Sequence, residues 1–247
     1  MAKKKQTVFG IAMRNFTKYP EMPSAQALID YGVRMEELGY ESIWAWDHIL
    51  LGVDFHQRGK IMEQCLEVIN RLWTEEKVDG DYPPYKLRGA VLYPKPVQKP
   101  RPPILIGGYV DAVLKRAATK GDGWLTYYYT AESFARAWAK VRDYAEEAGR
   151  DPDTLISTNQ LPICIGSRAT IEAPMKQWLQ TEWDYASWSE STMESAIMGT
   201  VEECVEQLEP HIATGIDRII FVPYRYENEQ VEAVAKEIIP RLRKKMM

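Results

Sequence analysis

Apolar and polar residues alternate along this chain with two periods, one typical of strands and the other of helices. The first apolar run is VFGIAMRN (8–15). Apolar residues then recur at helical spacing from Ser24, a candidate N-cap, until Gly39 ends the pattern. The run SIWAW (42–46) follows at once. Strand, helix and strand in this order, with short connections, predict a βα unit and a parallel sheet.

The alternation continues to the end of the chain. Further strands are predicted at 103–108, 123–129, 157–167 and 217–224. Helices are predicted at 60–73, 111–121, 132–149, much of 170–214 and 229–245. The Pro-rich and aromatic stretch at 78–102 predicts an excursion or hairpin outside the repeat. No linker divides the chain, so we expect one α/β domain over residues 1–247, either a barrel or a doubly wound sheet, with about six βα strands.

Composition narrows the class of protein. With 247 residues, 45% hydrophobic and 27% charged, the chain is long enough to bury a full core. A net charge of -4 gives no general attraction to nucleic acid or anionic membranes, and the basic runs MAKKK and RLRKK lie at the two ends. No apolar run approaches the roughly 20 residues of a membrane span, and the N-terminus lacks a secretory signal. We therefore expect a cytoplasmic protein with neither nucleic acid nor membrane as partner.

Cysteine and histidine usage argues against a metal site. Cys65, Cys164 and Cys204 are far apart, and each lies in an apolar periodic setting, which predicts buried free thiols. The three histidines form no HExxH pattern, and no CxxC occurs. No P-loop, GxSxG or GxGxxG is present either. No metal is therefore predicted.

Two ionisable residues, Asp47 and His48, directly follow the second predicted strand. In βα folds, functional side chains gather at the carboxyl ends of the strands. An imidazole with a pKa near 6.5 suits proton donation or acceptance, and Asp47 could fix its tautomer or cap the next element. A histidine that is hydrogen-bonded at a strand end, without chemistry, is the alternative.

Gly107, Gly108 and Tyr109 follow a predicted strand and open a predicted helix. This is the geometry in which backbone N–H groups and a helix N-terminus bind phosphate, and glycine permits close approach of an anionic oxygen. An ordinary strand-to-helix turn is the alternative.

Aromatic residues lie at the ends of two other predicted strands, among them Trp46 at the end of 42–46 and Tyr127 within 123–129. Such rings stack on a planar ligand or fill a barrel core, and with Asp47 these two are the substrate-pocket candidates.

Three longer stretches resemble the bacterial-luciferase-like flavin and deazaflavin oxidoreductases. They are RMEELGYESIWAWDHIL, EVINRLW and PKPVQKPRPPILIGGYVDAVLKRAATKGDGW. GTVEECVEQLEPHIATGIDRIIFVP also resembles the closing helix and strand of that family. The resemblance implies a (β/α)₈ barrel that binds FMN or the deazaflavin coenzyme F420 at the carboxyl ends of its strands. The implied chemistry is hydride transfer to, or oxygenation of, a small organic substrate.

The resemblance also implies residue roles. His48 matches the histidine that lies beside the reacting ring and is assigned proton transfer. Gly107, Gly108 and Tyr109 match the loop that binds the cofactor phosphate. Val110 and Asp111 continue into the helix whose N-terminus points at that phosphate. These five are the cofactor-binding candidates, and His48 is the catalytic one.

The chain departs from the family pattern near residues 51–55, where LLGVD meets FHQRGK. Family members place about two further βα units there, so a shortened, TIM-barrel-like fold is predicted. Either the remaining strands rearrange, or an open sheet leaves edges for dimerisation to cover. Two functions follow: an FMN- or F420-dependent oxidoreductase or monooxygenase, or a shortened scaffold that binds a cofactor without catalysis or is inert. A homodimer is expected in either case.

Overall fold

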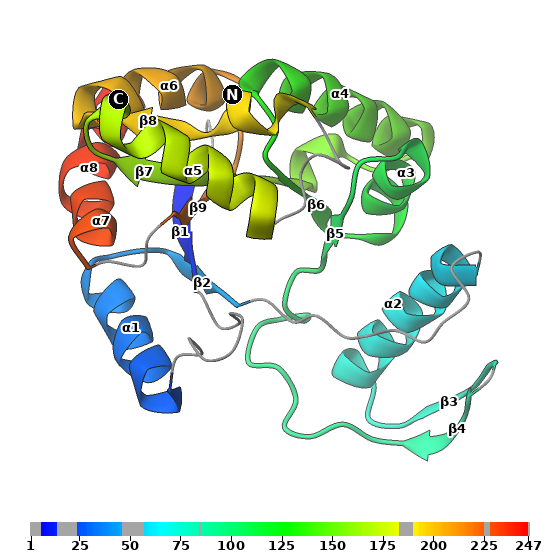
Figure 1. Cartoon of the computed structure of the whole chain (residues 1–247). Coiled ribbons are helices and arrows are strands. Elements are labelled where there is room, and N and C mark those ends of the chain that lie inside the picture. The colour runs from blue at the N-terminus through cyan, green and yellow to red at the C-terminus, as the bar shows by residue number, and fades with distance from the viewer. Residues whose placement is uncertain are drawn as a thin grey trace.

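A parallel sheet forms the centre of the computed structural model, which describes residues 6–13, 24–45, 57–83, 85–182, 190–224 and 228–246 (Figure 1). Its strand order is β2-β1-β9-β7-β6-β5. The strands are β1 (Val8–Ala12), β2 (Ser42–Trp44), β5 (Leu105–Gly107), β6 (Gly123–Tyr127), β7 (Ile156–Ile165) and β9 (Arg218–Pro223). All pairings between them are parallel, so the predicted α/β fold with six βα strands is confirmed. A short strand that the sequence did not predict, β8 (Ile197–Gly199), pairs with the end of β7.

Several helices begin or end where local chemistry predicts. They are α1 (Ala25–Glu37), α3 (Asp111–Lys120), α4 (Ala131–Glu147), α5 (Arg168–Glu182), α6 (Val201–Ala213), α7 (Asn228–Ala233) and α8 (Ile239–Met246), with a π-helical turn at Val234–Ile238 and 3₁₀ turns at Pro152–Thr154 and Glu190–Ser195. The Ser24 hydroxyl caps α1 by accepting from the Ala27 amide at 3.1 Å. Gly39 follows α1 and Gly149 follows α4, with φ of 78° and 71°, the left-handed conformation that glycine supplies.

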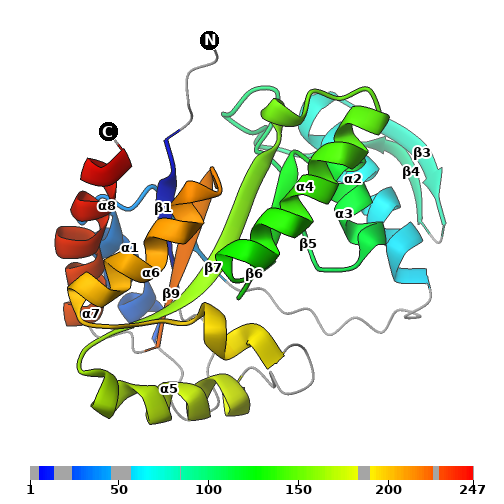
Figure 2. The ribbon, with the colours of Figure 1, turned by 90° about the horizontal axis from the view of Figure 1, so that it is seen from above.

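The hydrophobic core lies between the sheet and the helices α1, α3, α4, α6, α7 and α8 (Figure 2). Alternate residues of each strand point into it. In β9, Ile219 and Phe221 belong to this core, whereas Ile220 and Val222 lie on the opposite face with Ala12. The Phe9 and Phe221 rings stack at 5.8 Å between neighbouring strands. Because the strands are parallel, their carboxyl ends lie at one edge of this packed sheet.

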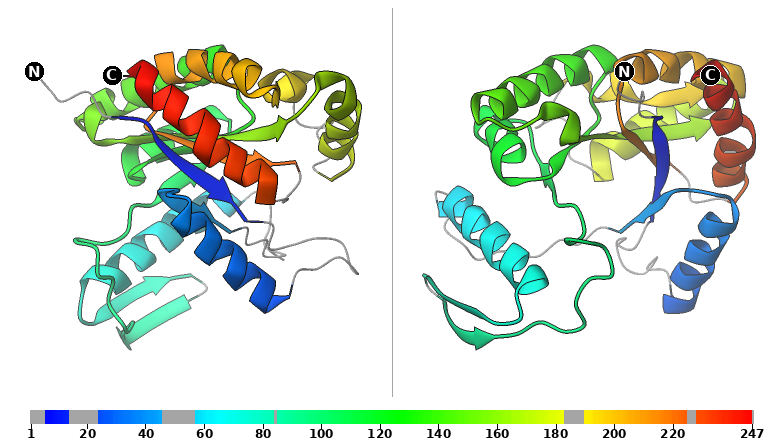
Figure 3. Two further views of the ribbon diagram at one scale, coloured as in Figure 1. Left: turned by 90° about the vertical axis from the view of Figure 1, so that its left-hand side faces the viewer. Right: turned by 180° about the vertical axis from the view of Figure 1, so that it is seen from behind.

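The sheet is open between β2 and β5. These strands stand at the two ends of the strand order, and each is only three residues long. The described residues therefore form a half-barrel instead of the closed eight-stranded barrel of the family, and of the two arrangements left open by the sequence the open sheet is the one observed. The right-hand view of Figure 3, from behind, shows α1 on one side of the opening and α2 on the other.

An excursion outside the repeat lies beside this opening, as the Pro-rich composition predicted (Figure 1). It consists of α2 (Arg58–Thr74) and the antiparallel hairpin of β3 (Val78–Tyr82) and β4 (Tyr85–Ala90). The Arg71 guanidinium joins helix and hairpin by donating to the Tyr82 hydroxyl at 2.9 Å. Residues 91–103, which we call the strap, then lead back to β5.

Cysteine burial differs from expectation at one position. Cys164 and Cys204 are buried as predicted, whereas Cys65 is exposed. The apolar setting of Cys65 predicted a covered position, but Leu66 is the buried residue among the described side chains of α2, and the face that carries Cys65 is left uncovered. Among the described residues, no helix is long and apolar enough to cross a membrane, and no group of three His, Cys, Asp or Glu side chains could hold a metal.

Candidate functional site

The turn between β5 and α3 has the geometry of an anion-binding site. The strand ends at Gly107, and the helix begins at Asp111. Val113 and Leu114 donate the first helical hydrogen bonds, both to the Val110 carbonyl, at 2.8 and 3.1 Å. The Val110 side chain provides no cap. Amides of the first turn have no acceptor within a helix, and with the helix dipole they favour a bound anion.

Gly108 determines the shape of this turn. Its φ is 133°, and a Cβ there would lie 3.1 Å from Val113 Cγ1. Its carbonyl accepts a hydrogen bond from Trp124 Nε1 at 2.8 Å, so the next strand fixes the orientation of the turn. Gly107 is different, because a Cβ there would meet only the Leu125 carbonyl at 3.7 Å. The requirement for glycine is therefore steric at Gly108 and not at Gly107.

A cation that the sequence did not single out lies beside the turn. Lys140 of α4 places its Nζ 2.9 Å from a carboxylate oxygen of Asp111. This hydrogen bond and ion pair raise the pKa of Lys140 above its ordinary value. The Asp111 carboxylate would repel a phosphate and compete for Lys140, so Asp111 can favour an anion only through its backbone amide. Nothing in the sequence of α4 marks Lys140, because its position depends on how α3 and α4 pack.

Three tyrosines gather at the carboxyl ends of β5 and β6. The ring of Tyr109 makes an edge contact with Tyr127 at 4.9 Å and stacks on Tyr129 at 5.5 Å. Burial, and then a hydrogen bond to Tyr127, raise the pKa of Tyr109, and burial also raises that of Tyr127. Both hydroxyls are therefore protonated at neutral pH. The structure thus brings together the cofactor-binding candidates Gly107 to Asp111 and the pocket candidate Tyr127.

Buried polar groups lie on the same sheet face as Tyr127. The strand register places Tyr127, Gln160 and Ile220 in one row across three strands. Gln160 is 5% exposed and Thr158 is fully buried. Within the described ranges, Gln160 Oε1 and Thr158 Oγ1 have no hydrogen-bond partner. Buried polar atoms normally have partners, so these two are candidate contacts for a bound group that the sequence analysis missed.

The other predicted site residues, Trp46, Asp47 and His48, lie outside the described residues. They follow β2, whose last residue is Trp44. The indole of Trp44 lies beneath the Arg218 guanidinium, 5.8 Å from ring centre to Cζ. Gly107 ends β5 at the opposite edge of the sheet. The two predicted halves of the site therefore follow the two edge strands that border the opening.

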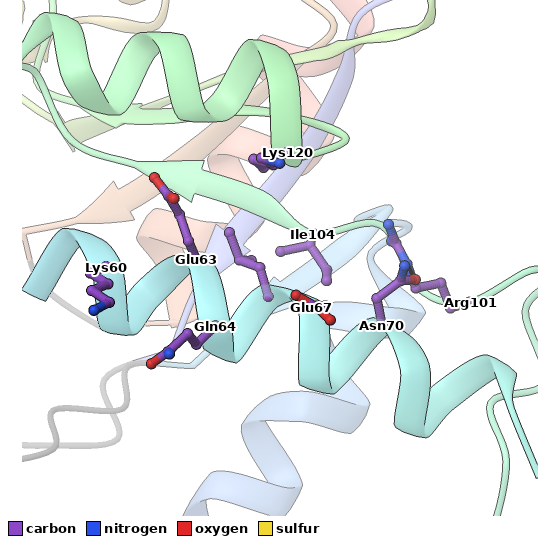
Figure 4. A pocket seen from close by; sticks show the side chains of 9 residues that line it. Lys60, Glu63, Gln64, Glu67, Asn70, Arg101, Ile104 and Lys120 are labelled. Carbon is purple, nitrogen blue, oxygen red and sulfur yellow. Dashed lines mark hydrogen bonds between the residues drawn. The ribbon is translucent and has the colours of Figure 1, made fainter. Parts of the chain in front are cut away.

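A separate polar cavity of about 410 Å³ lies at the other end of β5 (Figure 4). Its walls come from α2, from the strap and from the end of α3 at Lys120. Two of its charges already hold these elements together: Glu63 pairs with Arg116 at 3.3 Å, and Arg101 pairs with Asp122 at 2.5 Å. Asp122 also accepts from the Ile104 amide at 2.6 Å and so fixes the turn between α3 and β6 to the start of β5. We therefore interpret this cavity as part of the attachment of α2.

A family model described as luciferase-like monooxygenase matches residues 49–218 of this chain. An uncharacterised protein of Mycobacterium tuberculosis is 38% identical over 114 residues, which cover 44% of this chain and 37% of that protein. The F420-dependent glucose-6-phosphate dehydrogenase of the same species is 22% identical over 230 residues, covering 83% of this chain and 65% of the enzyme. The matches thus span less than two thirds of the length of these curated relatives.

Solved structures show the same fold. An F420-dependent secondary alcohol dehydrogenase, in complex with an F420–acetone adduct, superposes with a TM-score of 0.74 and 15% identity, covering 96% of this chain and 99% of that one. The monooxygenase RslO1 from Streptomyces bottropensis also superposes with a TM-score of 0.74, at 14% identity, over 95% and 99% of the two chains. At 15% and 14% sequence identity, the structural similarity shows a common fold and carries no conclusion about activity or substrate.

Proposed function

Because this chain belongs to the luciferase-like monooxygenase family, we propose that it is an oxidoreductase that binds the deazaflavin F420 at the carboxyl ends of its strands and acts on a small organic substrate. The turn from Gly107 to Asp111, with first-turn amides and Lys140 beside it, is the observation that carries the proposal. A relative that is F420-dependent by name supports deazaflavin over FMN. FMN remains the comparison ligand.

The residues present fit such a cofactor. The positive φ of Gly108 leaves a site next to Val113 that a Cβ would fill, and the first-turn amides can donate to a phosphate. The buried Gln160 and Thr158 oxygens offer polar contacts that no described residue satisfies. When bound, the cofactor supplies the redox chemistry.

The protein's own residues bind and orient the cofactor and move a proton during the reaction. The tyrosines at the ends of β5 and β6 exclude water from one side of the turn, and their protonated hydroxyls donate hydrogen bonds.

His48 is proposed as the group that moves a proton during turnover. A general acid or base contributes about 10²–10⁴-fold to a rate, so His48→Ala should lower turnover by that order and leave cofactor affinity unchanged. Equal losses in turnover and affinity would rule out this role.

Titration of the purified chain with F420, and separately with FMN, by fluorescence and absorbance tests the binding step. We expect saturable binding of F420 and weaker or no binding of FMN. An exposed ion pair is worth about 0.2–1 kcal/mol, so Lys140→Met should raise the dissociation constant up to about fivefold, and Asp111→Asn should lower it. Lys236→Met is the control, since the Lys236 side chain is as exposed as that of Lys140 and also pairs with a carboxylate, that of Glu232.

The titration, followed by a turnover assay with the reduced cofactor, separates three cases. Tighter FMN binding would replace deazaflavin with flavin in the proposal. Binding without turnover of the reduced form would reduce the protein to a cofactor-binding scaffold. If neither cofactor bound to a chain that unfolds cooperatively, the proposed function would be wrong.

A further inference from the structure

An arginine on the inner face of the sheet has no hydrogen-bond partner among the residues that the structure describes. We call inner the face opposite the helix layer, on which Ile220 and Val222 lie. Arg218 begins β9 and alternates in phase with these two residues, so its side chain lies on the same face. Its Nε is buried without a partner, and no described carboxylate pairs with its guanidinium. A largely buried cation without partners is unfavourable, so this arrangement indicates a group that is still to bind.

The indole of Trp44 holds this guanidinium in place. The indole lies over Gly10 of β1, where a Cβ would be 2.9 Å from its Nε1, and it donates to the Ser42 hydroxyl at 2.9 Å. Arg218 Cζ lies 5.8 Å from the centre of the Trp44 ring. The attraction between a cation and an aromatic face uses none of the guanidinium N–H groups. Arg218 is therefore oriented by Trp44, while no described residue accepts a hydrogen bond from it.

Other polar groups of the inner face lie next to Arg218. The strand register pairs it with Thr158, and Gln160 follows two residues further along β7. Thr158 is fully buried and Gln160 is 5% exposed, and the side-chain oxygens of both lack a partner within the described ranges. Tyr127 stands beside Gln160 at the end of β6. Three neighbouring strands thus bring together a cation, a hydroxyl, an amide and a phenol.

The rest of the inner face is apolar. It consists of Ala12, Ile220 and Val222, with Trp44, Leu125 and Trp178 packed against them. Leu125, Thr158 and Arg218 form one row across the sheet, and Tyr127 lies two residues, or about 7 Å, nearer the carboxyl edge. Arg218 is partly exposed, so an anion in solution can reach it. A ligand with one anionic end and an apolar body would therefore extend from Arg218 toward the turn that begins α3.

We propose that Arg218 and Thr158 bind the carboxylate of a small organic acid whose apolar body lies along the inner face. The guanidinium donates to the carboxylate oxygens, and the Thr158 hydroxyl donates a further hydrogen bond. One guanidinium balances one negative charge, whereas a phosphate ester would bring a second charge that no described group neutralises. Gln160, one row nearer the carboxyl edge, stays available to the cofactor. That this acid is the substrate rests on the proposed function, but its binding does not.

Calorimetric titration of the cofactor-free chain with hexanoate tests the site. We expect saturable binding of hexanoate, and weaker or no binding of hexanamide, which lacks the charge, and of hexyl phosphate. Arg218→Met should raise the dissociation constant at least about tenfold, as the loss of a hydrogen bond to a charged group does, and Thr158→Val about 2–10-fold. Arg142→Met is the control, because Arg142 belongs to α4 and pairs with Asp153 at 2.9 Å. No hexanoate binding, equal or tighter binding of either other compound, or equal losses in Arg142→Met and Arg218→Met would overturn the proposal.

Thermal unfolding separates ligand binding from a structural role of Arg218. Without ligand, Arg218→Met should melt no lower than the native chain, because the substitution removes a buried donor that has no partner. Hexanoate should raise the Tm of the native chain and of Arg142→Met, and leave that of Arg218→Met unchanged. An Arg218→Met variant that melts lower and gains as much from hexanoate as the native chain would show a structural role and overturn the proposal.

A parallel titration with F420 keeps this site apart from the proposed function. We expect Arg218→Met to bind F420 as the native chain does. Hexanoate binding that depends on Arg218, in a chain that does not bind F420, would support the site and refute the proposed function. F420 binding without hexanoate binding would refute the site alone.

Discussion

Replacing Gly108 with alanine is the sharpest test of the turn at the start of α3. The backbone φ of 133° is one that side chains with a Cβ rarely adopt, and the new methyl group would lie 3.1 and 3.3 Å from the two γ-carbons of Val113. A residue held in such a conformation costs about 1–3 kcal/mol. The variant should lose that much free energy of unfolding, which for a chain of this length lowers Tm by about 3–10 °C.

The same strain should appear in cofactor binding. If the turn relaxes to accommodate the methyl group, the amides that follow Gly108 move away from the ligand. A loss of about 1–3 kcal/mol corresponds to a dissociation constant about 5–150 times higher. Urea unfolding and an F420 titration of the same preparation measure the two effects separately.

Gly107→Ala is the matched control, one residue away. Its Cβ would make an ordinary contact with the Leu125 carbonyl at 3.7 Å. Its unfolding free energy should change by less than about 0.5 kcal/mol. If both variants lost the same stability, or if Gly108→Ala lost none, the steric account of the turn would be refuted.

Further predictions concern stability. Burial lowers the pKa of His211, 4% exposed at the end of α6, to about 4. The unfolded chain therefore binds this proton below about pH 6.5 and the folded chain does not, so about 3 kcal/mol of stability present above pH 6.5 is lost as the pH falls to about 4. Urea unfolding at pH 7.5 and 5.0 should show a smaller pH dependence for His211→Leu than for the native chain, and equal dependence would contradict this. Gly123→Ala should destabilise by about 3 kcal/mol or prevent folding, because its Cβ would lie 2.0 Å from the Ile156 carbonyl oxygen. Gly32→Ala, inside α1 with only Met13 Cε at 4.0 Å, should instead stabilise by about 0.5–1 kcal/mol in thermal melts, and a loss there would contradict the open space around it.

The pattern of apolar residues and the capping residues in the sequence were sufficient to predict most of the strands and helices. The period of the apolar residues located all six strands of the repeat, and Ser24, Gly39 and Gly149 marked helix ends that the structure confirms. The Pro-rich stretch correctly predicted a hairpin outside the repeat. These features depend on neighbours within a few residues, which is why the sequence alone determines them. The strand β8 escaped prediction because Ile197–Gly199 falls within the stretch 170–214, much of which the sequence analysis assigned to helices.

The residues of the candidate site could be predicted from the sequence only in part. Gly107 and Gly108 could be selected as candidates because glycines between a predicted strand and a predicted helix indicate a turn that a phosphate can approach closely. Lys140, Gln160 and Thr158 could not, since they reach the site through the packing of α3 on α4 and through strand register. Both depend on contacts between residues far apart in the chain.

The amino-acid sequence predicted the family, the βα order and a loss of about two units near residues 51–55. The arrangement of the remaining strands became visible only in the folded chain. Among the described residues, they keep their parallel register and leave the sheet open between β2 and β5, and Cys65 of α2 is exposed. The reason is physical: periodicity records which face of an element is apolar, whereas the burial of that face depends on whether another element is present to cover it.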